Sequence, residues 1–411
     1  MILPFPTGII IIQNILIAVI VATIIAEVDK YILNWGKKSL VLIIPFLFFP
    51  VLDSNLYPIR SSVYAYLELG LLLFLIIELI KSKENKNYKI SVKGMMIFSL
   101  LSIIVAVWRS ESFYYMLVTP ILFWLLFFKR NKKSVLFLVS TGILIGSIAG
   151  IKYQNKLLND TIGDQNTIIS TLPFIEDVLY NEDIKKEEIE LLEDIDIVLN
   201  LEVLYNQGSE SIWDSDTGLI RENYSKNQFK EYMLSYAKLV FKHPLAFLRV
   251  QLPISLQANG MLEGKQFIGS TRELYSGEGI YSVESIGEIF FIHDFTRPIS
   301  ANIRQKTITV LETLGNDPIS QLLHKVMYNA FIGITITAWV WGWAVKNRKW
   351  IFSIILLLPL VKVILLIGTV PGSAFMYWYP NYLIGWFLGV LVLCISLKSR
   401  NCKDVSLLGM F

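Results

Sequence analysis

Residues 350–369 read WIFSIILLLPLVKVILLIGT. Lys362 is the one charged side chain in this stretch. An apolar run of about twenty residues is what a helix needs in order to cross the roughly 30 Å of hydrocarbon in a bilayer. The segment therefore predicts a transmembrane helix, and the number of similar segments elsewhere in the chain decides the fold.

The rest of the sequence contains more runs of this kind. Of its 411 residues, 54% are hydrophobic and 17% are charged, which excludes a single water-soluble globule. Windows of about nineteen residues predict nine spans, near 8–27, 39–52, 60–80, 92–108, 112–128, 134–151, 326–345, 349–368 and 376–397. We therefore expect an all-α polytopic membrane protein with about nine transmembrane helices.

A long polar segment between the sixth and seventh predicted spans is expected to form one large, mainly helical domain outside the membrane. The predicted parts are an N-terminal transmembrane bundle, an extracytoplasmic domain, C-terminal transmembrane helices and a cytoplasmic tail, at 1–151, 152–325, 326–397 and 398–411. Residues 152–325 contain 16 basic and 26 acidic side chains, and this negative balance argues against a nucleic-acid partner.

Lysine and arginine in the short loops predict the orientation. Alternate loops carry 18 basic residues on one side and two, Arg60 and Arg109, on the other. Because cytoplasmic loops retain positive charge, we expect a multi-pass protein of the plasma (inner) membrane with a cytoplasmic C-terminus. Met1 and the 152–325 domain are then outside.

The sequence lacks the residues for several kinds of site. Cys394 and Cys402 are too few for a disulfide framework or a four-ligand zinc site. The sequence has no glycine-rich phosphate loop and no nucleophile elbow, so we predict no nucleotide cofactor. A divalent metal stays open through Asp214 and Asp216, although a turn or helix-cap role for this pair is favoured.

Two stretches of the polar segment are predicted to be helical. Residues 182–200 read as one acidic amphipathic helix, whose carboxylate face is expected to be solvated. Residues 226–250 have an apolar side flanked by basic residues, and fit either a helix in the headgroup plane or an ordinary core helix. Pro244 is expected to break this helix after His243.

Charges inside the predicted spans are candidates for function, because a charged side chain in hydrocarbon costs at least about 2.5 kcal/mol. Lys362 could meet a phosphate near the outer face, or its side chain could extend outward to the interface. Glu68 also lies within a span, and the favoured interpretation for it is a protonated or hydrogen-bonded contact between helices.

The predicted outer loops supply the other candidates. Arg109 and Glu111 lie in the turn between two spans, where they could bind an anionic or hydroxylated ligand or simply neutralise each other. Asp53 could act as a general base towards a sugar hydroxyl, although a solvated loop position is favoured, and Arg60 shares its loop. Aromatic residues near the last span, including Tyr377 and Tyr379, fit stacking on a sugar, packing on a polyprenyl chain, or an interface belt.

Three segments carry a resemblance to a known family: WRSESFYYMLVTPILFWLLFF at 108–128, YMLSYAKLVFKHPLAFLRV at 232–250 and MYWYPNYLIGW at 376–386. The arrangement resembles multispan membrane glycosyltransferases of the GT-C type, including bacterial members that build or decorate cell-surface polysaccharide. The resemblance covers most of residues 8–397, through loose motifs.

This resemblance implies hexosyl or pentosyl transfer from a polyprenyl-phosphate carrier at the outer face, without a nucleotide. The implied partners are a lipid-linked sugar donor, membrane lipids and a glycan or lipid acceptor. An acid in an outer loop would serve as base, from Asp53 or Glu111, and Lys362 or Arg109 would stabilise the departing phosphate. The remaining candidates for substrate binding are Arg60, Tyr377 and Tyr379.

The chain departs from the family pattern at its beginning. Family members usually start inside, cross once and display the catalytic acid in the first outer loop, whereas this chain is predicted to start outside, with MILPFPTG. The resemblance therefore indicates a shortened or inactive relative, or an acid that has moved to Asp53, Glu111 or the outer domain. The sequence also leaves open the sugar, the acceptor and the oligomeric state.

Two other functions fit the same layout. A polysaccharide polymerase or ligase would be expected to use arginines of the large outer segment, of which there are five: Arg221, Arg249, Arg272, Arg297 and Arg304. A non-enzymatic membrane partner or a transporter is the other alternative.

Overall fold

The computed structural model describes residues 7–56, 60–85, 87–161, 164–213, 218–262, 318–370, 372 and 375–402, together with residues 302, 306 and 309. These residues are almost entirely helical, and within them the only strand-like pairing is an isolated bridge between Leu199 and Ile220. The chain divides into two compact units: residues 1–150, 259–363 and 374–411 form unit 1, and residues 151–258 and 364–373 form unit 2.

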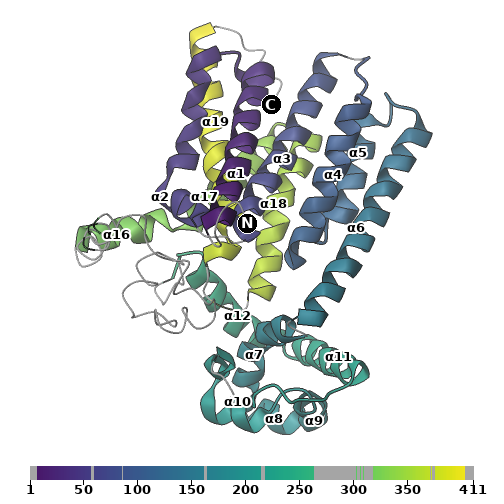
Figure 1. Ribbon diagram of the computed structural model, residues 1–411, viewed down its shortest axis with the longest axis vertical. Coiled ribbons are helices and arrows are strands. Elements are labelled where there is room, and N and C mark those ends of the chain that lie inside the picture. Colours follow the sequence, from purple (N-terminus) through teal and green to yellow (C-terminus); the bar gives the residue numbers. More distant parts are fainter. Residues whose placement is uncertain are drawn as a thin grey trace. The chain divides into compact units, whose positions relative to one another are not determined.

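Unit 1 contains the apolar helices. Their bounds are α1 Thr7–Val28, α2 Phe49–Asn55, α3 Arg60–Glu84, α4 Val92–Trp108, α5 Tyr115–Phe127, α16 Pro318–Met327, α17 Ala330–Lys346 and α19 Tyr379–Cys402, together with most of α6 Lys133–Thr161 and α18 Trp350–Thr369. A π-helical turn, Asp29–Leu33, and a 3-10 helix, Gly36–Leu47, join α1 to α2. In Figure 1, α4 and α5 lie between α3 and α6.

Five helical segments among the described residues are long and apolar enough to cross a membrane: Gly8–Leu33, Ser61–Glu84, Lys133–Leu157, Trp350–Thr369 and Tyr379–Lys398. The coarse prediction of a helical membrane protein is therefore confirmed. Two more predicted spans correspond to the shorter apolar helices α4 and α5, and the predicted span at 326–345 corresponds largely to the 17 residues of α17. The predicted span at 39–52 is divided between the 3-10 helix and α2, with Pro45 inside the former.

Helix α3 is the central helix of unit 1. Of its apolar window, 83% is buried against the protein, compared with 28% for α1 and for α6. It packs against α1, α4 and α19. Polar side chains on α3 therefore face other helices rather than lipid, and this placement makes buried polar contacts necessary.

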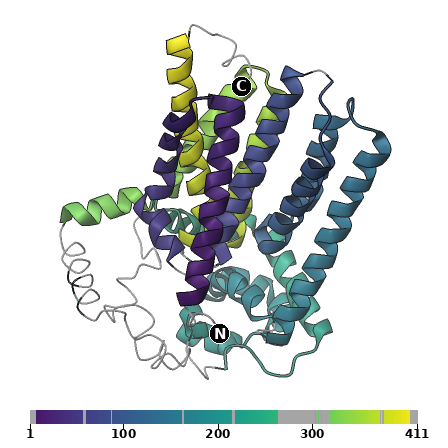
Figure 2. The ribbon, with the colours of Figure 1, turned by 45° about the horizontal axis from the view of Figure 1, so that its top comes forward.

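Helices α17 and α19 approach each other most closely at two glycines. A Cβ atom added to Gly385 would lie 2.0 Å from the carbonyl oxygen of Gly333. Small residues at such contacts let membrane helices pack backbone against backbone. Helix α16 instead projects sideways from the other helices of the unit (Figure 2), with Ile319, Leu322 and Val326 exposed.

Unit 2 is a small helical domain with its own apolar core. Its helices are the end of α6, α7 Gln165–Tyr180, α8 Glu182–Glu187, α9 Ile189–Asp196, α10 Leu201–Gln207, α11 Lys226–Lys242 and α12 Pro244–Ala258. The core includes Phe174, Ile195, Leu204, Tyr232 and Leu239, all fully buried. Tyr232 also shares a short hydrogen bond with the hydroxyl of Thr171.

The structure corrects one prediction for this unit and decides between two alternatives for another segment. The acidic stretch is two helices, because the chain breaks at Glu188, whose buried carboxylate accepts hydrogen bonds from Lys242 (2.7 Å) and His243 (3.0 Å). The basic stretch at 226–250 fits the core-helix alternative, since Phe229 and much of its apolar side pack on the domain core. The predicted break at Pro244 is confirmed: α11 ends at Lys242 and α12 begins at the proline.

Candidate functional site

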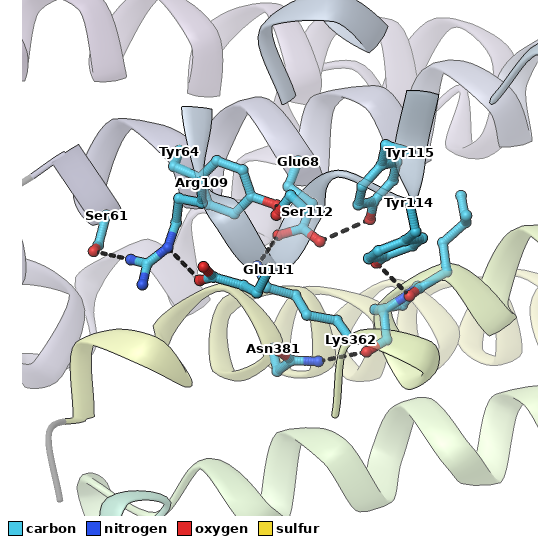
Figure 3. Close-up of polar contacts among 12 residues, drawn as sticks. Ser61, Tyr64, Glu68, Arg109, Glu111, Ser112, Tyr114, Tyr115, Lys362 and Asn381 are labelled. Carbon is cyan, nitrogen blue, oxygen red and sulfur yellow. Dashed lines mark hydrogen bonds and ion pairs between the residues drawn. The ribbon is translucent and has the colours of Figure 1, made fainter. Parts of the chain in front are cut away.

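Two buried cations and two carboxylates meet in unit 1, near the N-terminal end of α3, and we call Glu68, Arg109, Glu111 and Lys362 the Arg–Lys cluster (Figure 3). The cluster joins three parts of the chain: α3, the turn that follows α4, and α18. Each of the four side chains is at least nine-tenths buried. Because a buried charge is costly unless it is paired, each of these side chains needs a partner of opposite charge within the cluster.

Arg109 lies directly after α4, and Glu111 lies in a 3-10 turn, Ser110–Ser112. The Arg109 guanidinium forms an ion pair with Glu111 and donates a hydrogen bond to the hydroxyl of Ser61 on α3 (Figure 3). Its Cζ atom lies 5.1 Å from the centroid of the Tyr377 ring. Burial alone would raise the pKa of the Glu111 carboxyl, but the positive charges of Arg109 and Lys362 outweigh it, so that the pKa is below its usual value.

Lys362 is fully buried on α18, which excludes the alternative in which its side chain extends outward to the interface. Its Nζ atom donates to Oε2 of Glu68 at 2.8 Å and lies 4.2 Å from the centroid of the Tyr64 ring. The other carboxylate oxygen of Glu68 accepts a hydrogen bond from the Tyr115 hydroxyl at 2.7 Å. The favoured interpretation of Glu68, a hydrogen-bonded contact between helices, is confirmed.

Further hydrogen bonds fix the helices around the cluster. The hydroxyls of Tyr64 and Ser112 are 2.6 Å apart. On α18, the carbonyl oxygen of Leu358 accepts from the Tyr114 hydroxyl, and that of Pro359 accepts from the side-chain amide of Asn381 (Figure 3). These contacts fasten the middle of α18 to α19 and to the turn that carries Glu111.

Asp53 belongs to a second polar group. It is buried on α2, and its Oδ2 accepts a hydrogen bond from the Tyr328 hydroxyl at 2.5 Å, so the favoured solvated-loop position is wrong. Nearby, the hydroxyl of Tyr66 accepts from Asn55 at 2.8 Å and from Tyr379 at 3.4 Å. We call these five residues the Asp53 group.

The two groups lie on different sides of α3. Tyr64 and Glu68 are four residues apart and share one face, whereas Tyr66 is about 200° around the helix from Tyr64. The residues named from the sequence are thus divided: Glu111, Arg109, Lys362 and Tyr377 meet at one place, and Asp53 and Tyr379 at another. Arg60 begins α3, but its side chain lies outside the described residues, as do Asp214 and Asp216.

Several hydrogen-bond partners in these two groups were not predicted from the sequence. Ser61 and Tyr64 precede Glu68 at helical spacing, so their shared face of α3 was a signal that could have identified them. Tyr115 and Tyr328 carried no such signal, because their contacts join distant segments: Tyr328 is 275 residues from Asp53.

One group of side chains in the described part of the chain has the spacing of metal ligands: Glu187, Glu188 and His243 in unit 2. Glu188 already accepts hydrogen bonds from His243 and Lys242, which makes this an ion-pair centre. The described arginines of the same unit are also paired, Arg221 with Asp196 and Arg249 with Asp177, while Arg272, Arg297 and Arg304 lie outside the described residues.

No protein-family model matches the chain. A search of curated proteins and a search of solved structures likewise return no significant match. The similarity to GT-C glycosyltransferases therefore stays a prediction from the three quoted segments, and the geometry of the Arg–Lys cluster is the basis for a functional proposal.

Proposed function

We propose that the chain is a membrane glycosyltransferase, which moves a hexosyl or pentosyl group from a polyprenyl-phosphate carrier to a glycan or lipid acceptor at the cell surface. The supporting observation is the Arg–Lys cluster, in which two buried cations meet two carboxylates beside tyrosine rings. Such a site offers positive charge for a lipid phosphate and a base for a sugar hydroxyl.

The cations have distinct tasks. As the bond between the sugar and the phosphate breaks, negative charge grows on the phosphate and needs nearby positive charge. The guanidinium of Arg109 can hold two phosphate oxygens at once, whereas Lys362 supplies a point charge. In the structure, Glu111 and Glu68 occupy these positions, and a phosphate at Arg109 would take the place of the Glu111 carboxylate.

Glu111 is the proposed general base. Once displaced from Arg109, the Glu111 carboxylate accepts the proton of the acceptor hydroxyl, whose oxygen attacks the anomeric carbon. The bond between the anomeric carbon and the phosphate oxygen breaks at the same time, and the polyprenyl phosphate leaves. In the pair with Arg109, before displacement, the pKa of the Glu111 carboxyl is below its usual value, so the group is ionised at neutral pH. Asp53 is the alternative base, but it is held by Tyr328 on another side of α3.

The proposal includes the finer topology predicted from the sequence. About nine spans, a cytoplasmic C-terminus and the 152–325 segment outside would place the turn with Arg109 and Glu111 at the outer face, where a carrier delivers its sugar. An inactive relative of the GT-C enzymes would keep this layout while losing transfer.

A non-enzymatic membrane scaffold is the second candidate. Both cations of the Arg–Lys cluster already have a carboxylate partner. This observation favours the scaffold, because a cluster of paired charges can serve only to hold helices together. No described contact favours the polymerase alternative, since the described outer arginines are paired and partly exposed.

Analysis of surface glycans separates these candidates. In cells of the source organism, the chromosomal gene would be replaced by Glu111→Gln, by Asp53→Asn or by the control Glu222→Gln, which alters an exposed carboxylate of unit 2. The proposal expects Glu111→Gln to remove one sugar from a surface glycan, detected by mass spectrometry, while the control glycan is unchanged. If Glu111→Gln protein is present at the normal level and the glycans are intact, the scaffold function is favoured instead.

A further inference from the structure

A second candidate site lies at the other end of α3, where a groove of about 700 Å³ separates α3, α5 and α18 within unit 1. Its walls are mainly apolar and include Leu79, Ile121, Leu125 and Ile351. Ile121 and Leu125 are 58% and 48% exposed, so the groove opens to the surroundings of the helices. For helices in a bilayer these surroundings are acyl chains, which match such walls.

Three cations line one end of the groove: Lys83 near the end of α3, and Lys129 and Arg130 in the turn after α5. No Asp or Glu is among the described residues that line it. The Nη1 atom of Arg130 is buried and has no hydrogen-bond acceptor among the described residues. A buried donor without an acceptor calls for an oxygen atom from a ligand.

We propose that this groove binds an anionic phospholipid, with its phosphate at Lys83, Lys129 and Arg130 and an acyl chain along Ile121 and Leu125. A free phosphate would use the cations but leave the apolar walls uncovered, whereas a phospholipid satisfies both. The basic end belongs to loops that the charge distribution predicts to be cytoplasmic, the leaflet in which anionic lipids attract such residues.

This groove is separate from the Arg–Lys cluster. Glu68 of the cluster and Lys83 of the groove belong to the same helix, and their separation of 15 residues corresponds to about 22 Å along its axis. One lipid phosphate cannot reach both sites. The inference therefore stands independently of the proposed glycosyl transfer.

Lipid binding to the purified, delipidated full-length chain tests the proposal. Native mass spectrometry in a neutral detergent would compare dioleoyl phosphatidylglycerol, dioleoyl phosphatidylcholine and glycerol phosphate, which has the anionic group without tails. We expect phosphatidylglycerol to bind most tightly, and Arg130→Gln to weaken it about tenfold, as loss of a charge-assisted hydrogen bond would. Lys129→Gln is a second variant, in case Arg130→Gln does not fold.

Lys132→Gln is the matched control, because Lys132 is exposed in the same loop and does not line the groove. It removes the same charge and should leave phosphatidylglycerol binding unchanged. Equal weakening by Lys132→Gln would overturn the proposal in favour of general surface attraction. Equal binding of phosphatidylcholine, or of glycerol phosphate, would overturn it as well, because the headgroup charge or the tails would then be irrelevant.

Discussion

Removing either member of the Lys362–Glu68 pair should destabilise unit 1 far more than removing both. The two side chains are 0% and 1% exposed, and their charged atoms are 2.8 Å apart. Lys362→Met leaves the Glu68 carboxylate buried with the Tyr115 hydroxyl as its described partner, and Glu68→Gln leaves a buried ammonium facing a neutral amide and the Tyr64 ring. Loss of one partner of a buried ion pair costs about 3–5 kcal/mol.

The double variant Lys362→Met/Glu68→Gln contains neither charge, and replacement of a whole buried pair is often close to neutral. We therefore expect a free energy of unfolding within about 1 kcal/mol of the wild type, and a coupling energy of at least about 5 kcal/mol between the two sites. Titration with SDS in dodecyl maltoside micelles, followed by circular dichroism, would measure all four proteins.

The exposed pair Lys186–Glu182 provides the control cycle. Its atoms are 3.6 Å apart and its side chains are 75% and 66% exposed, so a coupling of at most about 0.5 kcal/mol is expected. Single variants of Lys362 and Glu68 that each cost less than 1 kcal/mol, or whose effects simply add, would refute the argument that these charges depend on each other inside the protein.

Two further predictions concern packing and pH. Gly385→Ala should lower the free energy of unfolding by about 3 kcal/mol in the same assay, because the added Cβ would meet the Gly333 backbone. The control Gly342→Ala, whose Cβ would have nothing within 4 Å, should leave the free energy of unfolding unchanged or raise it by up to about 1 kcal/mol. Equal effects of the two variants would contradict the close contact. Burial alone would raise the pKa of the Glu188 carboxyl, but hydrogen bonds from Lys242 and His243 outweigh burial and hold the pKa below its usual value. The ionised carboxylate therefore contributes fully to the free energy of unfolding above about pH 4.5, and this contribution is lost as the pH falls through the lowered pKa. Denaturant midpoints of the wild type should therefore decrease on acidification below that pH by more than those of Glu188→Gln, and parallel curves would contradict the contribution of this carboxylate.

The sequence identified the individual charges of the Arg–Lys cluster but not how they pair. Lys362 and Glu68 were noticeable because each interrupts an apolar run. Their hydrogen bond joins positions 294 residues apart, and hydropathy contains no information about which helices are neighbours. The pairing of Arg109 with Glu111 could be predicted, since the two residues share one short turn.

Other expectations failed because tertiary packing determined the outcome. Asp53 looked like a residue of a solvated loop, but α2 buries it against Tyr328, which precedes α17. The basic residues of 226–250 left a helix at the membrane surface open beside a core helix, and the structure fits the core helix, because the apolar side of the segment packs on the domain core with Phe174 of α7 and Ile195 of α9. For both segments the order of polar and apolar residues gave the local character correctly, but it contained no information about which distant helix packs against the segment.

Transfer of sugar from a carrier is the most direct measurement of the proposed glycosyltransferase activity. Membranes of the source organism, lacking the gene and supplied with the wild-type or the Glu111→Gln chain, would be given undecaprenyl phosphate carrying radiolabelled glucose, galactose, mannose or arabinose. We expect that one of these donors loses its label to an acceptor with the wild-type chain and keeps it with Glu111→Gln. Retention of label on every donor with the wild-type chain, or equal transfer by both chains, would contradict the proposed activity.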